Sequence, residues 1–199
     1  MTPKIILASG SPRRCELLKS LGLDFEIIKP DVDESHLKNE NPKDLCVRLA
    51  ELKACAVANE HKNFLVIAAD TIVVVENANE NLILGKPENR ENAFNMLKIL
   101  QGREHKVLTG VTIAFNGNLI SDFESTLVKF RPLNENEIRA YISTGESDDK
   151  AGAYAVQGKG SLLVESITGD YFNVVGLPIC KLGLMLENFG ITLEKILCI

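Results

Sequence analysis

The turn at residues 8–14, Ala-Ser-Gly-Ser-Pro-Arg-Arg, combines residue types that suit the binding of phosphate groups. Arginine guanidinium groups form charge-assisted hydrogen bonds with phosphate oxygens, and a serine hydroxyl can donate a further one. Ser9, Arg13 and Arg14 are therefore candidate phosphate ligands. The alternative is a surface turn with solvated arginines. The Gly-Lys-Ser/Thr signature of a P-loop is absent.

The residues around this turn predict a strand before it and a helix after it. An apolar run occupies 5–7, and leucines at helical spacing begin at Leu17. Ser11 is typical of a helix N-cap and Pro12 of the first helical position. A helix start presents unpaired N–H groups and a partial positive charge, which favours an anion at the same place.

Asp70 interrupts the apolar stretch 64–75, which otherwise predicts a buried central strand. A carboxylate in such a place is costly to bury unless it is paired, hydrogen-bonded or bound to a metal. Asp70 is therefore the strongest single candidate for a catalytic residue, and Thr71 follows it directly. The alternative is an aspartate that accepts backbone N–H groups where the strand breaks.

Two more candidates flank this strand in the sequence. Glu34 ends an acidic segment after the strand expected at 25–28, and carboxylate oxygens suit a hard divalent cation; the alternative is a solvated loop. Lys53 lies on the helix expected at 42–59, beside a stripe formed by Leu45, Leu49, Leu52 and Ala56. It either contacts a phosphate or extends its ammonium group to solvent.

Lys86 and Gln157 lie in two later turns. The Gly-Lys-Pro turn at 85–87 follows a short strand and either holds an amine over an anion or is plain surface. Gln157 lies in a segment of small residues, and its amide can donate and accept, as reading a base edge requires. The glycines at 158 and 160 either form a bulge or serve that segment; they do not make a dinucleotide fingerprint.

Three local patterns predict further elements. Asn-Gly-Asn at 116–118 joins two alternating segments and predicts a β-hairpin. Asn134 and Glu137 form a capping box at the start of a short helix. The polar segment 76–81 is expected to be a turn before the strand 82–84.

Length, net charge and the numbers of cysteine and histidine residues restrict the class of protein. The 199 residues suffice for one α/β domain, with two lobes as an option, and the net charge of −5 argues against a broad nucleic-acid-binding surface. Five scattered cysteines indicate free thiols in a reducing compartment, and three histidines without ligand spacing argue against a histidine metal centre. No signal peptide or membrane-length apolar run is present, so we expect a cytoplasmic protein without a membrane partner.

The chain resembles the Maf proteins, the septum-formation-inhibitor family of nucleoside triphosphate pyrophosphatases, over nearly its whole length. Five ordered motifs carry the resemblance: residues 8–14, 68–71, 85–87, 150–158 and 169–178.

The resemblance implies a single domain over 1–199 with two lobes, a mixed, twisted sheet flanked by helices, and a fold similar to the inosine triphosphate pyrophosphatases (Maf/Ham1), with the nucleotide in a central cleft. It implies hydrolysis of a nucleoside triphosphate to the monophosphate and pyrophosphate with Mg²⁺ or Mn²⁺. The dTTP/UTP pyrophosphatase subgroup looks most similar, because its specificity positions fall on Arg13, Thr71 and Gln157, with Lys86 as a further matching lysine.

Roles follow as a hypothesis. Ser9, Arg13 and Arg14 would hold the triphosphate, with Lys53 and Lys86 adding charge. Glu34 and Asp70 would hold the metal, and Asp70 would act as proton acceptor through a metal-bound water of lowered pKa.

Two other functions stay open at this stage: a nucleotide-binding regulator of cell division without turnover, and a nucleotidyltransferase. The residues also leave open whether the pyrimidine nucleotide is normal or modified, and whether the chain forms a homodimer.

Overall fold

Three parallel strands carry most of the candidate site in the computed structural model, which describes residues 3–37, 40–76 and 81–198. They are β1 (Lys4–Ala8), β2 (Phe25–Ile28) and β3 (Phe64–Val75). β1 lies between the other two, and Ala8 at its end pairs with Ile28 of β2 and Ala68 of β3. Because β1 leads to β2 on one side and the chain returns to β3 on the other, the carboxyl end of β1 is where an α/β sheet gathers a ligand site.

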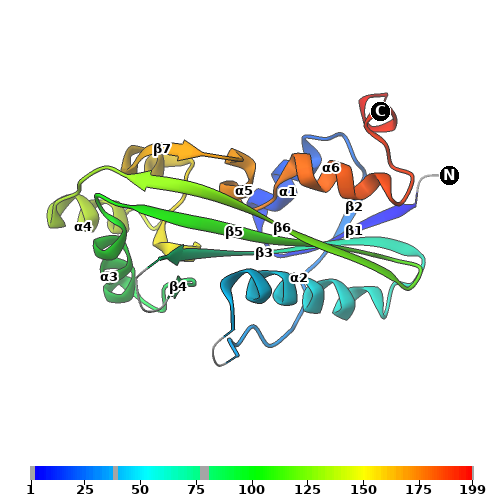
Figure 1. Ribbon diagram of the computed structural model, residues 1–199, viewed down its shortest axis with the longest axis horizontal. Coiled ribbons are helices and arrows are strands. Elements are labelled where there is room, and N and C mark those ends of the chain that lie inside the picture. Colours follow the sequence, from blue (N-terminus) through cyan, green and yellow to red (C-terminus); the bar gives the residue numbers. More distant parts are fainter. Residues whose placement is uncertain (1–2, 38–39, 77–80, 199) are drawn as a thin grey trace. The chain divides into compact units, whose positions relative to one another are not determined.

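Within the described ranges the sheet has seven strands in the order β2-β1-β3-β5-β6-β7, with β4 paired to β3 (Figure 1). The β3–β4 and β6–β7 pairs are antiparallel, so the sheet is mixed and the predicted α/β class is confirmed. The other strands are β4 (Leu82–Leu84), β5 (Glu104–Phe115), β6 (Asn118–Phe130) and β7 (Val164–Thr168). The helices are α1 (Pro12–Lys19), α2 (Pro42–Ala58), α3 (Arg90–Leu100), α4 (Glu135–Ser143), η1 (Ala151–Ala153), η2 (Gly158–Leu163), α5 (Tyr171–Val175), α6 (Ile179–Glu187) and α7 (Leu193–Leu197).

The chain divides into two compact units. The first unit contains residues 1–70, 109–124 and 176–199, and the second contains 71–108 and 125–175. Within the described ranges, no helix combines the length and the apolar character that crossing a bilayer would need.

Helix α2 packs on the parallel strands of the first unit. Ala54 and Val57 lie in one buried cluster with Ile6 of β1 and Val66 of β3. The predicted stripe of α2 is right for Leu45 and Leu49 and wrong for Leu52, which is 39% exposed, and for half-buried Ala56. The buried face instead includes Cys46, Ala50, Lys53 and Val57. On this side α2 approaches β5 closely at Gly110, where a Cβ atom would lie 2.2 Å from the carbonyl oxygen of Cys46.

The local patterns of the sequence form as predicted. Ser11 is the N-cap of α1, with Pro12 in its first turn. Asn116 and Gly117 both have positive φ, as a tight hairpin turn between β5 and β6 requires. The capping box of α4 is complete. The predicted turn at 76–81 falls largely on residues 77–80, which lie outside the described residues, and β4 follows as expected.

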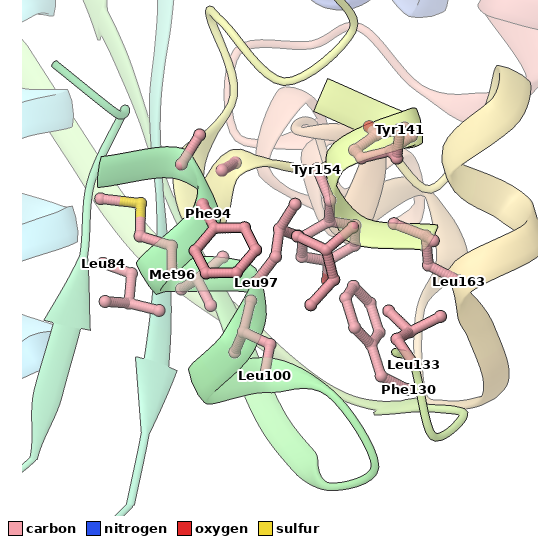
Figure 2. Close-up of a cluster of buried hydrophobic side chains, with 14 of the residues drawn as sticks. Leu84, Phe94, Met96, Leu97, Leu100, Phe130, Leu133, Tyr141, Tyr154 and Leu163 are labelled. Carbon is pink, nitrogen blue, oxygen red and sulfur yellow. The ribbon is translucent and has the colours of Figure 1, made fainter. Parts of the chain in front are cut away.

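The core of the second unit is rich in aromatic side chains (Figure 2). Phe94 and Leu97 of α3 lie in one cluster with Phe130 of β6 and with Tyr154. His105 packs edge-on against Phe130 and Tyr154, is 2% exposed, and places Nε2 2.8 Å from the Tyr154 hydroxyl. Burial is the main reason why the pKa of His105 is lowered to about 4, and the charge of Arg103 lowers it further.

Because His105 is buried with a lowered pKa, we expect the chain to lose stability in mild acid. In the unfolded chain the pKa is near its ordinary value of 6.5, so between pH 6.5 and pH 4 the unfolded state binds the extra proton. The free energy of unfolding should therefore fall by about 3 kcal/mol as the pH drops through that window. Denaturant unfolding at pH 7 and pH 4.5 measures it. His105→Gln should lose much of the dependence, and an unchanged pH dependence would contradict the assignment.

Candidate active site

Asp70 points toward α2 from the middle of a continuous strand. Side chains alternate along β3, so Asp70 shares a face with Val66 and Ala68, which pack in the same cluster as α2. It is only 7% exposed. Because β3 runs unbroken through this position, the interpretation of Asp70 as an aspartate at a strand break is wrong.

Lys53 supplies the charge that makes this burial tolerable. Its Nζ donates to Asp70 Oδ1 at 2.5 Å and lies 3.0 Å from Glu34 Oε1. Lys53 is 7% exposed and lies on the buried face of α2, so the interpretation of a solvent-directed lysine is wrong. Glu34, after β2, remains half exposed. One ammonium group thus joins two carboxylates from two different segments.

Ser9 and Arg14 form the second part of the cluster, directly after β1. Ser9 is 5% exposed, and its Oγ accepts from the Ser11 N–H at 3.1 Å and from Arg14 Nη1 at 3.3 Å. Arg14 Nε also donates to the Gly176 carbonyl at 2.7 Å. Both bonds to Ser9 use its oxygen as acceptor, so its own proton can still be donated to a ligand.

The guanidinium group of Arg14 links the two parts electrostatically. Burial lowers its pKa, and the neighbouring charge of Arg13 acts in the same direction. The carboxylates of Asp70 and Glu34 oppose that shift, so they lie close enough to act on Arg14. The predicted residues Ser9, Arg14, Lys53, Glu34 and Asp70 are thus gathered in the first unit. Arg13 lies next to them on the first turn of α1.

The buried cysteine beside this cluster is not a nucleophile. Burial raises the pKa of Cys46 to about 12, with the Asp70 carboxylate as the next contribution. The thiol therefore stays protonated near neutral pH, and its Sγ donates to the Lys43 carbonyl instead.

The donor set of Glu34 and Asp70 fits a hard divalent cation that is shared with a ligand. Both carboxylates reach one Nζ atom, so they converge on one small volume. Within the described ranges, no group of three or more acidic, histidine or cysteine side chains forms a complete metal cage. Mg²⁺ is usually held by one or two carboxylates together with substrate phosphates. Glu34 and Asp70 would supply the carboxylates, and the phosphates of a ligand would complete the set.

The remaining candidates, Thr71, Lys86 and Gln157, belong to the second unit. The Gly85 carbonyl beside Lys86 accepts from the Gly152 N–H at 3.0 Å. A Cβ atom at Gly152 would lie 2.9 Å from Val73, which shares a face of β3 with Thr71. Gly85, Gly152 and Val73 are therefore neighbours, which brings the Gly-Lys-Pro turn and the start of the segment 150–158 together beside β3. Lys86 and Gln157 are exposed.

Two kinds of group that hold the site residues in place were not predicted from the sequence. The Gly176 carbonyl orients Arg14, and a backbone acceptor has no signature in residue types. Tyr141 and Glu146 hold the segment around Gln157, and neither stood out because each looks like an ordinary helix or turn residue. The glycines at 158 and 160 fold into η2 and form no strand bulge.

Comparisons with known proteins agree on one family. The sequence model described as Maf-like protein matches residues 4–189. A protein of Clostridioides difficile named dTTP/UTP pyrophosphatase is 50% identical over 187 residues, which is 93% of this chain and 94% of that one. Proteins of the same name are 54% identical in Thermoanaerobacter sp., covering 90% of this chain and 93% of theirs, and 48% identical in Bacillus thuringiensis, covering 94% and 96%.

A comparison with solved structures finds partial likenesses. The solved structure of the Staphylococcus aureus Ham1 protein superposes with a TM-score of 0.47 and 18% identity, over 64% of this chain and 71% of that chain.

Proposed function

The chain belongs to the family of Maf-like proteins, and we propose that it is a metal-dependent pyrophosphatase that hydrolyses dTTP and UTP to the nucleoside monophosphate and pyrophosphate. The names of its relatives support the activity and the two substrates. The observation that carries the proposal is the buried Lys53–Asp70 pair, joined by Glu34, beside the Ser9–Arg14 turn. A cationic turn and an oriented carboxylate are two of the parts that phosphoanhydride cleavage needs, beside the metal ion.

The turn after β1 would bind the phosphate chain. Arg14 is held by Ser9 and by the Gly176 carbonyl, so its guanidinium group is positioned before a ligand arrives. Arg13, the Ser9 hydroxyl and the N–H groups at the start of α1 would add further donors to phosphate oxygens. We also propose Lys86 as a phosphate ligand.

Asp70 would accept the proton of the attacking water. Its Oδ1 is engaged by Lys53, so Oδ2 is the oxygen that would face a metal-bound water of lowered pKa, through which Asp70 would act as proton acceptor. Lys53 holds the carboxylate in place and balances its charge in a buried site, where an unpaired carboxylate would be costly.

Glu34 and Asp70 are the residues that would hold Mg²⁺ or Mn²⁺. A divalent cation bound there would neutralise phosphate charge and lower the pKa of a water molecule. We place no other described residue in this role.

A panel of nucleoside triphosphates tests the proposal. With Mg²⁺ or Mn²⁺ present, dTTP and UTP should be hydrolysed with a higher kcat/KM than CTP, ATP and GTP. A base-modified pyrimidine triphosphate belongs in the panel, because the amide of Gln157 can hydrogen-bond only part of the base edge and would not distinguish changes elsewhere on the base. A chain that binds these nucleotides and turns none of them over would overturn the proposal.

Gln157→Ala tests how the base is selected. Without the amide, the preference for dTTP over purine triphosphates should fall by roughly 10-fold, the effect of one lost hydrogen bond in a polar recognition site. The ratio of kcat/KM values for dTTP and GTP measures it. An unchanged ratio would argue against a contact between this side chain and the base.

The surroundings and the assembly of the enzyme are part of the same proposal. All five cysteines are free thiols, which favours the reducing conditions of the cytoplasm. The partner is a small-molecule nucleotide, not a nucleic acid or a membrane, and a homodimer is a state for sedimentation analysis to test.

A further inference from the structure

The segment that carries Gln157 is a closed loop whose two ends touch. A Cβ atom at Gly160 would lie 2.0 Å from the Ala155 carbonyl oxygen, so the backbone at the end of the loop lies directly against its beginning. Gln157 lies between these points and is exposed. The position of its side chain therefore depends on what fixes the two ends.

Side chains from α4 and the turn after it fix both ends. The Tyr141 hydroxyl accepts from the Ala155 N–H at 3.0 Å. The carboxylate of Glu146 accepts from the Lys159 N–H through Oε1 and from the Gly160 N–H through Oε2, each at 3.1 Å. Each carboxylate oxygen thus has its own backbone donor, and charged acceptors make such bonds stronger than neutral ones.

The local backbone is adapted to Glu146. Gly158 has a φ of 62°, and a Cβ atom there would lie 3.0 Å from Glu146 Oε1. Any larger residue would be strained and would press on the carboxylate. Glu146 itself follows Gly145, whose positive φ ends α4 and turns the chain toward the loop. These contacts all lie within the second unit.

We propose that Glu146, assisted by Tyr141, is a positioning residue for base selection: it holds the loop 155–160 in the one conformation that presents Gln157 to the pyrimidine. This inference rests on the proposed function, and it assigns to Glu146 no contact with the substrate. Glu146 sets how well the Gln157 amide is placed and takes no part in the cleavage step.

Glu146→Ala should therefore change selectivity more than rate. The ratio of kcat/KM for dTTP over GTP should fall by roughly 10-fold, as for Gln157→Ala, with KM for dTTP rising more than kcat falls. Glu146→Gln retains one acceptor oxygen and should lose less, and Tyr141→Phe, which removes the acceptor for Ala155, should lose selectivity in the same direction. In the double variant with Gln157→Ala, Glu146→Ala should lower the selectivity little further, because both changes remove the same contact between Gln157 and the base.

Glu135→Ala is the matched control, since it removes a carboxylate at the other end of the same segment, at the start of α4, where it pairs with Lys98 on the surface. It should leave the ratio unchanged. If Glu146→Ala lowers kcat/KM equally for all nucleotides, or keeps the wild-type ratio, its role is only structural and the inference fails.

Hydrogen exchange separates this failure from failure of the proposed function. The amides of Ala155, Lys159 and Gly160 should be protected in the wild-type chain, and the last two should exchange faster in Glu146→Ala. Normal protection in that variant would show that Glu146 does not hold the loop 155–160, whatever the substrate. A wild-type chain that turns over neither dTTP nor UTP would instead refute the proposed function, and with it the role in base selection. The exchange data would still show whether Glu146 holds the loop 155–160.

Discussion

Asp70→Asn should abolish nearly all hydrolysis of dTTP while the chain stays folded. Asparagine has the same shape and keeps an oxygen within reach of Lys53, but it cannot accept the proton of the attacking water. Loss of a general base typically costs between about 100-fold and 10,000-fold in rate. Steady-state kinetics with dTTP and Mg²⁺ measures the loss, and the circular dichroism spectrum should match that of the wild type.

Asp122→Asn is the control for this variant. Asp122 also pairs with a lysine, Lys181, at 2.8 Å in the first unit, but on the surface. Its removal should leave turnover within about twofold, since exposed pairs contribute little. Turnover by Asp70→Asn at a rate near that of Asp122→Asn would show that Asp70 does not perform the chemistry.

Lys53→Met should cost both stability and activity. The thioether fills a similar volume but leaves the buried Asp70 carboxylate without its cation. Breaking one side of a buried ion pair costs about 3–5 kcal/mol, because the remaining charge is stranded away from water. Urea unfolding at pH 7 would measure the loss, and turnover of dTTP should fall with it because Asp70 is no longer held in place.

The double variant Lys53→Met/Asp70→Asn distinguishes a stranded charge from poor packing. Once the carboxylate is neutral, much of the lost stability should return, so the two changes should be strongly non-additive. Lys181→Met is the matched control, since Lys181 also contacts two carboxylates, of Asp122 and Glu124, at the surface. It should cost less than about 1 kcal/mol. A double variant as unstable as the sum of its parts would contradict the pairing.

Much of the first unit could be predicted because its patterns are local. The apolar run before Ser9 and the Ser11-Pro12 start of α1 specify a strand, a turn and a helix from adjacent residues. Asp70 stood out because a charge within an apolar strand is costly wherever the strand lies. Its burial and its ion pair agree with that argument.

The contacts between distant segments could not be predicted in the same way. Helical spacing placed Lys53 at the border of a stripe, but Lys53 lies on the buried face of α2, where it meets Asp70 of a strand distant in the sequence. The bond from Arg14 to the Gly176 carbonyl joins residues 162 positions apart through the backbone, which residue types do not reveal. The hold of Glu146 on the loop 155–160 likewise depends on how the turn after α4 is directed.

The products of dTTP hydrolysis test the central claim most directly. Phosphorus NMR of the reaction with Mg²⁺ distinguishes cleavage between the α- and β-phosphates from loss of the terminal phosphate. If the Asp70–Lys53–Glu34 cluster and the Ser9–Arg14 turn act as proposed, the wild-type chain should release dTMP and pyrophosphate in equal amounts, and Asp70→Asn should release neither at a comparable rate. Formation of dTDP and orthophosphate, or equal turnover by both chains, would contradict it.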